Sequence, residues 1–210
     1  MKLRGIRRSR NIEDRRRSGG GGRGAGIGGV GLLVVLAIGY FAGIDVTPLL
    51  QDGGPLSQTS APRDLTPEEA HAAEFSAQVL ATTEEVWDTL LPAQLGQTYT
   101  SPVMVLYSGI TQSPCGGASG ATGPFYCPAD QKAYLDTAFF ATLSQRLGAR
   151  GDFAAAYVIA HEVAHHVQNQ LGILGKVNER RQSVGQTEAN ALTVRLELQA
   201  DCLSGVWAQA

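Results

Sequence analysis

Residues 153–168 read Phe-Ala-Ala-Ala-Tyr-Val-Ile-Ala-His-Glu-Val-Ala-His-His-Val-Gln, a run that predicts an α-helix. Asp152 is a candidate N-cap for this helix, and Gly172 is a natural stop. Residues four apart lie on one face of a helix, so His161 and His165 present two imidazole nitrogens to the same point. The run therefore predicts a helix that supplies two ligands to one metal ion.

The pattern His-Glu-x-x-His at 161–165 is typical of catalytic zinc sites. Such a site needs three protein ligands and one open position for water. Glu162 is turned about 100° from His161 by the helical period, so it can reach the metal-activated water without being a ligand. We therefore predict that Glu162 is the general base of a zinc-activated hydrolysis. His166, turned away from His165, is expected to have a structural or supporting role.

A second helix, predicted over 187–203, carries Glu197 and Asp201 on one face. Glu197 is suited to be the third zinc ligand. Asp201 can accept a hydrogen bond from a ligand histidine and fix its tautomer. This second pair argues against a mere polar helix face. A closed structural zinc site is also disfavoured, because such sites use four cysteine or histidine ligands.

The chain resembles the bacterial neutral zinc metallopeptidases, a family of single-pass membrane proteins with a zincin-type domain. The resemblance covers nearly the whole chain and is carried by residues 1–5, 11–16, 115–119, 123–131, 134–136, 139–140, 161–168 and 197–202. It implies His161, His165 and Glu197 as Zn²⁺ ligands and Glu162 as catalytic base, as in gluzincins. It also implies a peptide or protein substrate. Members usually continue for several dozen residues past such a second helix, so we expect the peptidase domain to be C-terminally incomplete at Ala210.

The charge of the chain is unevenly distributed. Residues 1–25 hold nine Lys/Arg and two acidic residues, a charge of +7, while the remainder holds eight and seventeen, a charge of −9, for a net charge of −2. A basic head can bind nucleic acid. However, it is followed by nineteen uncharged residues, 26–44, which as a helix would span about 28 Å, close to the thickness of the hydrocarbon core.

We therefore expect a transmembrane helix over 26–44 and no nucleic-acid partner. The positive-inside rule predicts that the basic head, 1–25, is cytoplasmic and that the catalytic domain lies outside the cell membrane. The rival interpretation is a cleaved signal peptide, with Ala37 and Gly39 at positions −3 and −1.

The rest of the chain predicts an α+β, zincin-like domain over 66–210, mainly helical with a small sheet. Residues 45–65 are rich in Pro, Gly and Ser and predict a linker. Thr66-Pro-Glu-Glu begins a helix that is expected to end before Pro92. Short strands are predicted at 103–107, 125–127 and 131–135, with a glycine-rich loop at 108–124. By resemblance, 125–135 is the candidate strand for binding the substrate backbone.

Three cysteines bear on the compartment and the core. Cys115 and Cys127 flank the glycine-rich loop, and on the oxidising side of a membrane they are expected to form a disulfide. The alternative is two free thiols. Cys202 is expected to be a small core residue.

The sequence thus favours a membrane-anchored zinc metalloendopeptidase. The alternative is a non-catalytic, zincin-like binding module of the cell envelope. Stoichiometric zinc without turnover would distinguish this alternative from the peptidase. A third reading, a structural anchor without metal, is disfavoured by the complete ligand set.

Overall fold

The computed structural model describes residues 3, 5–17, 64–119, 123–140 and 151–210. Residues 1–16 and 65–210 form one compact unit, to which every element below belongs. The predicted transmembrane helix over 26–44 and nearly all of the predicted linker over 45–65 lie outside the described residues. Among the helices that are described, none is long and apolar enough to cross a membrane.

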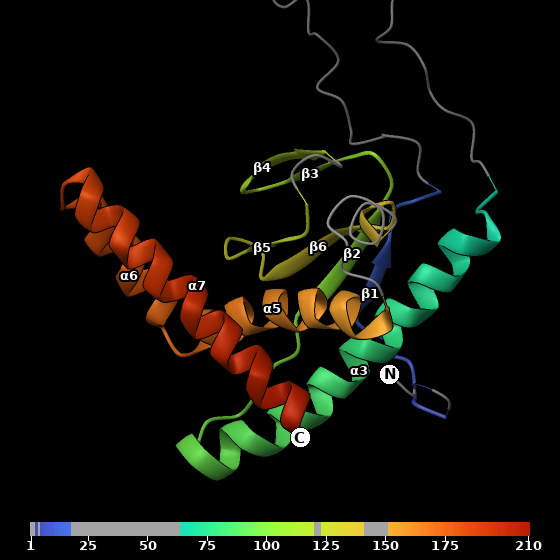
Figure 1. Ribbon diagram of the computed structural model, residues 1–210, viewed down its shortest axis with the longest axis horizontal. Helices are drawn as coiled ribbons and strands as arrows, with labels where there is room; N and C mark the ends of the chain where they lie inside the picture. The colour runs from blue at the N-terminus through green and yellow to red at the C-terminus, as the bar shows by residue number, and fades with distance from the viewer. Residues whose placement is uncertain (1–2, 4, 18–63, 120–122, 141–150) are drawn as a thin grey trace, which may run out of the picture. The chain divides into compact units, whose positions relative to one another are not determined.

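The described unit is α+β, as predicted (Figure 1). Its helices are α3 (Pro67–Leu95), α5 (Asp152–Gln170), α6 (Ile173–Gln182) and α7 (Gln186–Gln209). Its strands are β1 (Ile12–Asp14), β2 (Val103–Tyr107), β3 (Ile110–Ser113), β4 (Gly116–Ser119), β5 (Phe125–Cys127) and β6 (Lys132–Asp136).

The main sheet has the strand order β1-β2-β6-β5. β2 pairs in parallel with both β1 and β6, whereas β5 pairs antiparallel with β6 and forms an edge. Helix α5 runs beneath this sheet and is crossed by α7 (Figure 1). One hydrophobic core joins these layers, with buried residues from α3, β2, α5 and α7 such as Leu80, Leu106, Val163 and Trp207. The helix with the histidines is therefore held between a sheet and two other helices.

Helices α3 and α5 begin almost where the sequence predicts. Thr66 caps α3 with a reciprocal pair of hydrogen bonds to Glu69, a capping box. Helix α3 nevertheless continues past Pro92, contrary to the prediction. A proline this close to the end removes only one helical hydrogen bond, and Gly96, with φ of 63°, ends the helix.

The N-cap of α5 is Gly151 rather than Asp152. Asp152 instead lies in the first turn, where its negative charge interacts favourably with the helix dipole.

The predicted loop over 108–124 is wrong in part, because it contains the hairpin β3-β4. Ile110 is 72% exposed, and the hairpin lacks the alternating apolar pattern that reveals a half-buried strand. Backbone pairing and a hydrogen bond from the Ser113 hydroxyl to the carbonyl oxygen of Gly116, 2.8 Å long, hold it together. These interactions leave little trace in the sequence.

The N-terminal segment also differs from the predicted separate head, since residues 1–16 pack with 65–210. β1 pairs with β2, and basic side chains meet acidic ones: Arg7 with Glu84 at 2.8 Å and Arg8 with Glu74 at 2.5 Å. The physical reason is charge complementarity with the acidic face of α3. Among the described basic residues of this segment, Arg7, Arg8, Arg15 and Arg16 form ion pairs within the folded unit.

Candidate metal centre

Two helices supply the polar side chains of the site. Helix α5 carries His161, Glu162 and His165, and α7 carries Glu197 and Asp201. Helices α5 and α7 are in contact, and both carry buried small residues: Ala160 and Ala164 on α5 and Ala200 on α7. The site thus forms where two helices cross beneath the sheet.

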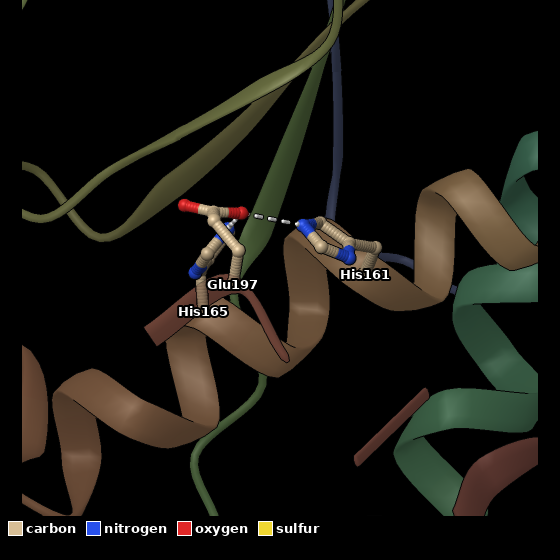
Figure 2. Close-up of side chains that lie close together, drawn as sticks. All are labelled: His161, His165 and Glu197. Atoms are coloured by element: carbon tan, nitrogen blue, oxygen red, sulfur yellow. Dashed lines mark hydrogen bonds and ion pairs between the residues drawn. The ribbon is translucent and has the colours of Figure 1, made fainter. Parts of the chain in front are cut away.

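The structure brings His161, His165 and Glu197 together (Figure 2). Oε2 of Glu197 lies 3.1 Å from Nε2 of His161 and 3.3 Å from Nε2 of His165. Tetrahedral ligands about 2.1 Å from zinc are separated by about 3.4 Å, so the spacing suits that ion. One ligand atom from each of the three residues lies within 4.8 Å of the others.

The hydrogen bonds of the histidines favour a cation at this point. Nδ1 of His161 donates to Oδ1 of Asp201 at 3.0 Å, and Nδ1 of His165 donates to Oε1 of Gln168 at 2.9 Å. The Gln168 amide must present its oxygen to His165, because its Nε2 donates to the carbonyl of Leu196. The Nδ1 partners leave both Nε2 atoms directed at the carboxylate oxygen of Glu197. A divalent cation between these three atoms would be coordinated by two imidazole nitrogens and one carboxylate oxygen.

Glu162 lies beside these ligands but is not one of them. Burial, then the negative charge of Glu197, raises the pKa of the Glu162 carboxyl to about 8, while a hydrogen bond from the backbone N–H of Tyr126 opposes the shift. A bound cation would act in the opposite direction to Glu197. The side chain thus has the burial and the position of a proton-transferring group.

A hydrogen-bonded network ties strand β5 to α5. His166 is buried; its Nε2 donates to the carbonyl of Thr100 at 2.6 Å, and its Nδ1 accepts from the Tyr126 hydroxyl at 3.0 Å. Asn169 donates to the same hydroxyl at 3.1 Å. Burial lowers the pKa of His166, in keeping with a neutral ring. The network fixes β5, and hence the N–H group that reaches Glu162.

A pocket of about 380 Å³ opens over the ligands. It is bounded by β5 and the segment before it, by α5, by α6 and by α7. Its lining residues are Pro124, Phe125, Tyr126, Pro128, His161, Glu162, His165, Leu174, Asn178, Arg181, Leu196 and Glu197. The candidate ligands and Glu162 are therefore accessible to a ligand from solvent.

A His-Glu-x-x-His helix with a glutamate from a second helix defines the class of zinc proteins with two histidine ligands and one carboxylate ligand. Within that class, the chain belongs to the family described as "Putative neutral zinc metallopeptidase", whose sequence profile matches residues 1–210. Zinc is the cofactor that this membership implies.

The curated relatives carry no assigned function. The chain is 46% identical to the uncharacterized protein YpfJ of Escherichia coli K12 over 215 residues, which cover 99% of this chain and 74% of the relative. It is 49% identical to the uncharacterized protein Rv2575 of Mycobacterium tuberculosis H37Rv over 126 residues, which cover 60% of this chain and 40% of the relative. No solved structure matches the chain at a significant level.

Sequence reasoning assigned no role to Gln168 and included Tyr126 only within the candidate substrate strand 125–135. Gln168 lies three residues after His165, a spacing that places both on one helix face and could have identified it. Tyr126 acts through its backbone N–H, which leaves no signal in the sequence.

The cysteines give a mixed outcome. Cys115 and Cys127 form the expected disulfide. Cys202 is exposed, so its predicted place in the core is wrong. The face of α7 at position 202 is turned to solvent instead of toward α5.

Proposed function

We propose that this chain is a zinc metalloendopeptidase that hydrolyses peptide bonds in an accessible pocket between α5, α7 and β5. The observation that carries the proposal is the convergence of His161, His165 and Glu197 beside a buried Glu162. Family membership supports the same reaction class.

Zinc held by these three side chains would supply a Lewis acid that polarises the peptide carbonyl and acidifies water. Glu162 accepts the proton of the attacking water on its carboxylate and donates it to the leaving amine. Asp201 and Gln168 keep Nδ1 of each histidine protonated, so that Nε2 is available to the metal. The backbone N–H of Tyr126 orients the Glu162 carboxylate.

Strand β5 is the candidate for binding the substrate backbone. It forms the edge of the main sheet, and both Phe125 and Tyr126 line the pocket. An extended peptide can add to such an edge by main-chain hydrogen bonds. We propose that the scissile bond is positioned over the ligands in this way.

The test replaces Glu162 with Gln, which keeps the shape of the side chain and removes the proton acceptor. We expect the zinc content to stay at one ion per chain and casein hydrolysis to fall by about 10²- to 10⁴-fold. The control is His165→Ala, which should lose both zinc and activity. Cleavage by Glu162→Gln at the parent rate would remove the assigned role. Stoichiometric zinc with no cleavage by the parent would favour the non-catalytic binding module.

We further propose that residues 26–44 attach the chain to the cell membrane and that the catalytic unit lies outside the cytoplasm. The support for attachment is the uncharged run in the sequence. The Cys115–Cys127 disulfide supports an oxidising compartment. The pairing of β1 with β2 favours the N-terminal segment on that same side, which departs from the cytoplasmic N-terminus expected from charge.

A further inference from the structure

We propose that Arg181 binds a carboxylate group of the peptide and thereby makes the pocket select acidic or carboxyl-terminal segments. This inference rests on the proposed peptidase function, because Arg181 lines the pocket that holds the metal ligands. Arg181 belongs to α6, which forms a different wall of the pocket from β5. Strand β5 offers backbone groups to the peptide, whereas α6 offers a positive charge.

Helix α6 presents one face to the pocket. Leu174, Asn178 and Arg181 are spaced four and three residues apart, so they share that face, and all three line the pocket. Leu174 is buried and anchors the helix. Nη1 of Arg181 donates to Oδ1 of Asn178 at 3.1 Å, which holds the guanidinium at the pocket wall. Among the described residues, the other N–H donors of Arg181 have no partner and can bind a ligand.

The charge of Arg181 is not neutralised within the part of the chain that the structure describes, where no carboxylate lies within ion-pair distance of it. The adjacent Arg180 differs from Arg181 in charge pairing and in position. It pairs with Glu188 at 2.9 Å and is absent from the pocket lining. Of the lining residues, Arg181 is the only lysine or arginine.

A planar guanidinium binds a carboxylate with two parallel hydrogen bonds, so the preferred group on the peptide is a carboxylate. In the described residues neither acidic lining residue forms an ion pair with Arg181, and Glu197 lies beside the two histidines. The carboxylate can belong to an Asp or Glu side chain or to the C-terminus of the peptide. Both sources offer the same chemistry to Arg181.

The experiment measures binding by the full chain with Glu162→Gln, loaded with zinc, so that cleavage does not interfere. Four labelled peptides of otherwise one sequence carry Glu or Gln at one internal position, each with a free or an amidated C-terminus. We expect conversion of the recognised carboxylate to an amide to raise the Kd about tenfold. The pair of peptides that differ in affinity identifies the source of the carboxylate.

Arg181→Gln should abolish the difference in Kd between the carboxylate and amide peptides and leave the affinity for the amide peptides unchanged. The matched control, Arg180→Gln, should preserve this difference in Kd. The proposal is overturned if the four peptides bind equally, if none binds, or if Arg181→Gln weakens all four alike. Cleavage assays of the parent separate the two claims. Cleavage without a preference for a carboxylate would contradict only the role of Arg181. Arg181-dependent binding without any cleavage would contradict the proposed peptidase function.

Discussion

At the residue scale, Gln168 links the two helices that make the metal centre. Its side-chain oxygen accepts from Nδ1 of His165, and its nitrogen donates to the carbonyl of Leu196 and to Oε1 of Gln199 on α7. Gln168 is fully buried. The same amide therefore sets the tautomer of the ligand His165. It also holds Leu196, the residue that precedes the third ligand, Glu197.

Replacing Gln168 with Leu should weaken zinc binding about 10- to 100-fold, because Nδ1 of His165 loses its acceptor. The free energy of unfolding of the zinc-free chain should fall by about 1–3 kcal/mol, since a buried N–H and a buried carbonyl lose their partners. Chelator competition measures the first effect and urea denaturation the second. Gln170→Leu, two residues further along α5, is the control and should change zinc affinity little. Unaltered zinc affinity in Gln168→Leu would show that the tautomer is set in another way.

The residues of the site were largely predictable because helical spacing converts sequence directly into geometry. His161 and His165 needed only the four-residue spacing, and Glu197 with Asp201 needed it again on α7. What brings the two helices together could not be predicted. The packing of small buried residues at the crossing is a property of both helices at once, and no periodicity in either one specifies the crossing.

At the element scale, the acidic face of α3 holds the N-terminal segment through Glu84. Its carboxylate accepts from Nη1 of Arg7 at 2.8 Å, from the Ser9 hydroxyl at 2.5 Å and from Nδ2 of Asn11 at 2.9 Å. The side chain of Glu84 is only 6% exposed. A buried carboxylate with three donors from one segment fixes that segment as part of the fold.

Glu84→Ala should lower the free energy of unfolding by about 3 kcal/mol, because the three donors lose a buried partner. Glu85→Ala is the matched control. Glu85 contacts the same Arg7 at 3.1 Å, but it is 56% exposed, and its loss should cost less than about 1 kcal/mol. Urea denaturation of both variants compares the two effects. Equal small losses would indicate that the N-terminal segment contributes little to the stability of the unit.

Glu13 on strand β1 should make the stability of the folded unit depend on pH. Hydrogen bonds from Arg15, at 2.7 Å, and from Lys132, at 2.6 Å, lower the pKa of Glu13 below its ordinary value. Since the folded state favours the ionised form, the stabilisation is present above pH 4.5 and is lost as the pH falls through the lowered pKa. Glu13 is 38% exposed, so the effect should be under about 1 kcal/mol.

Glu13→Gln should therefore be less stable than the parent at about pH 7, and this gap should narrow as the pH is lowered to about 3. Urea unfolding at the two pH values measures the difference. A gap between parent and variant that is the same at both values would mean that charge at Glu13 is not its source.

The elements themselves show where sequence reasoning fails. Helix α3 was predictable from its capping box and apolar stripe, and β2 from its apolar run. Strand β1, Ile-Glu-Asp, has only three residues within a charged segment, so nothing in its local pattern indicates a strand. Its partner is β2, about ninety residues away in the sequence, and pairing over that distance is decided by the tertiary fold.

At the scale of the whole molecule, the pairing of β1 with β2 constrains how the chain can lie at a membrane. Paired strands lie about 5 Å apart, whereas the hydrocarbon core of a bilayer is about 30 Å thick. One crossing between Arg16 and Leu65 would place the two strands on opposite sides. The proposed attachment therefore keeps both strands on one side of the membrane, in place of the cytoplasmic N-terminus expected from charge.

The two arrangements differ in which side an impermeant reagent reaches. In a Cys202→Ser background, Arg10→Cys marks the N-terminal segment and Gln182→Cys marks the end of α6, both at exposed positions. In bacterial spheroplasts, we expect a membrane-impermeant maleimide to label both cysteines before lysis, because the sheet keeps them on one side and the Cys115–Cys127 disulfide favours the outside. Labelling of both cysteines only after lysis would be consistent with the pairing of β1 with β2 and would indicate that the compact unit lies in the cytoplasm. Labelling of Gln182→Cys alone would show that the chain in cells follows its charge distribution, with a cytoplasmic N-terminus, and that β1 does not pair with β2 there.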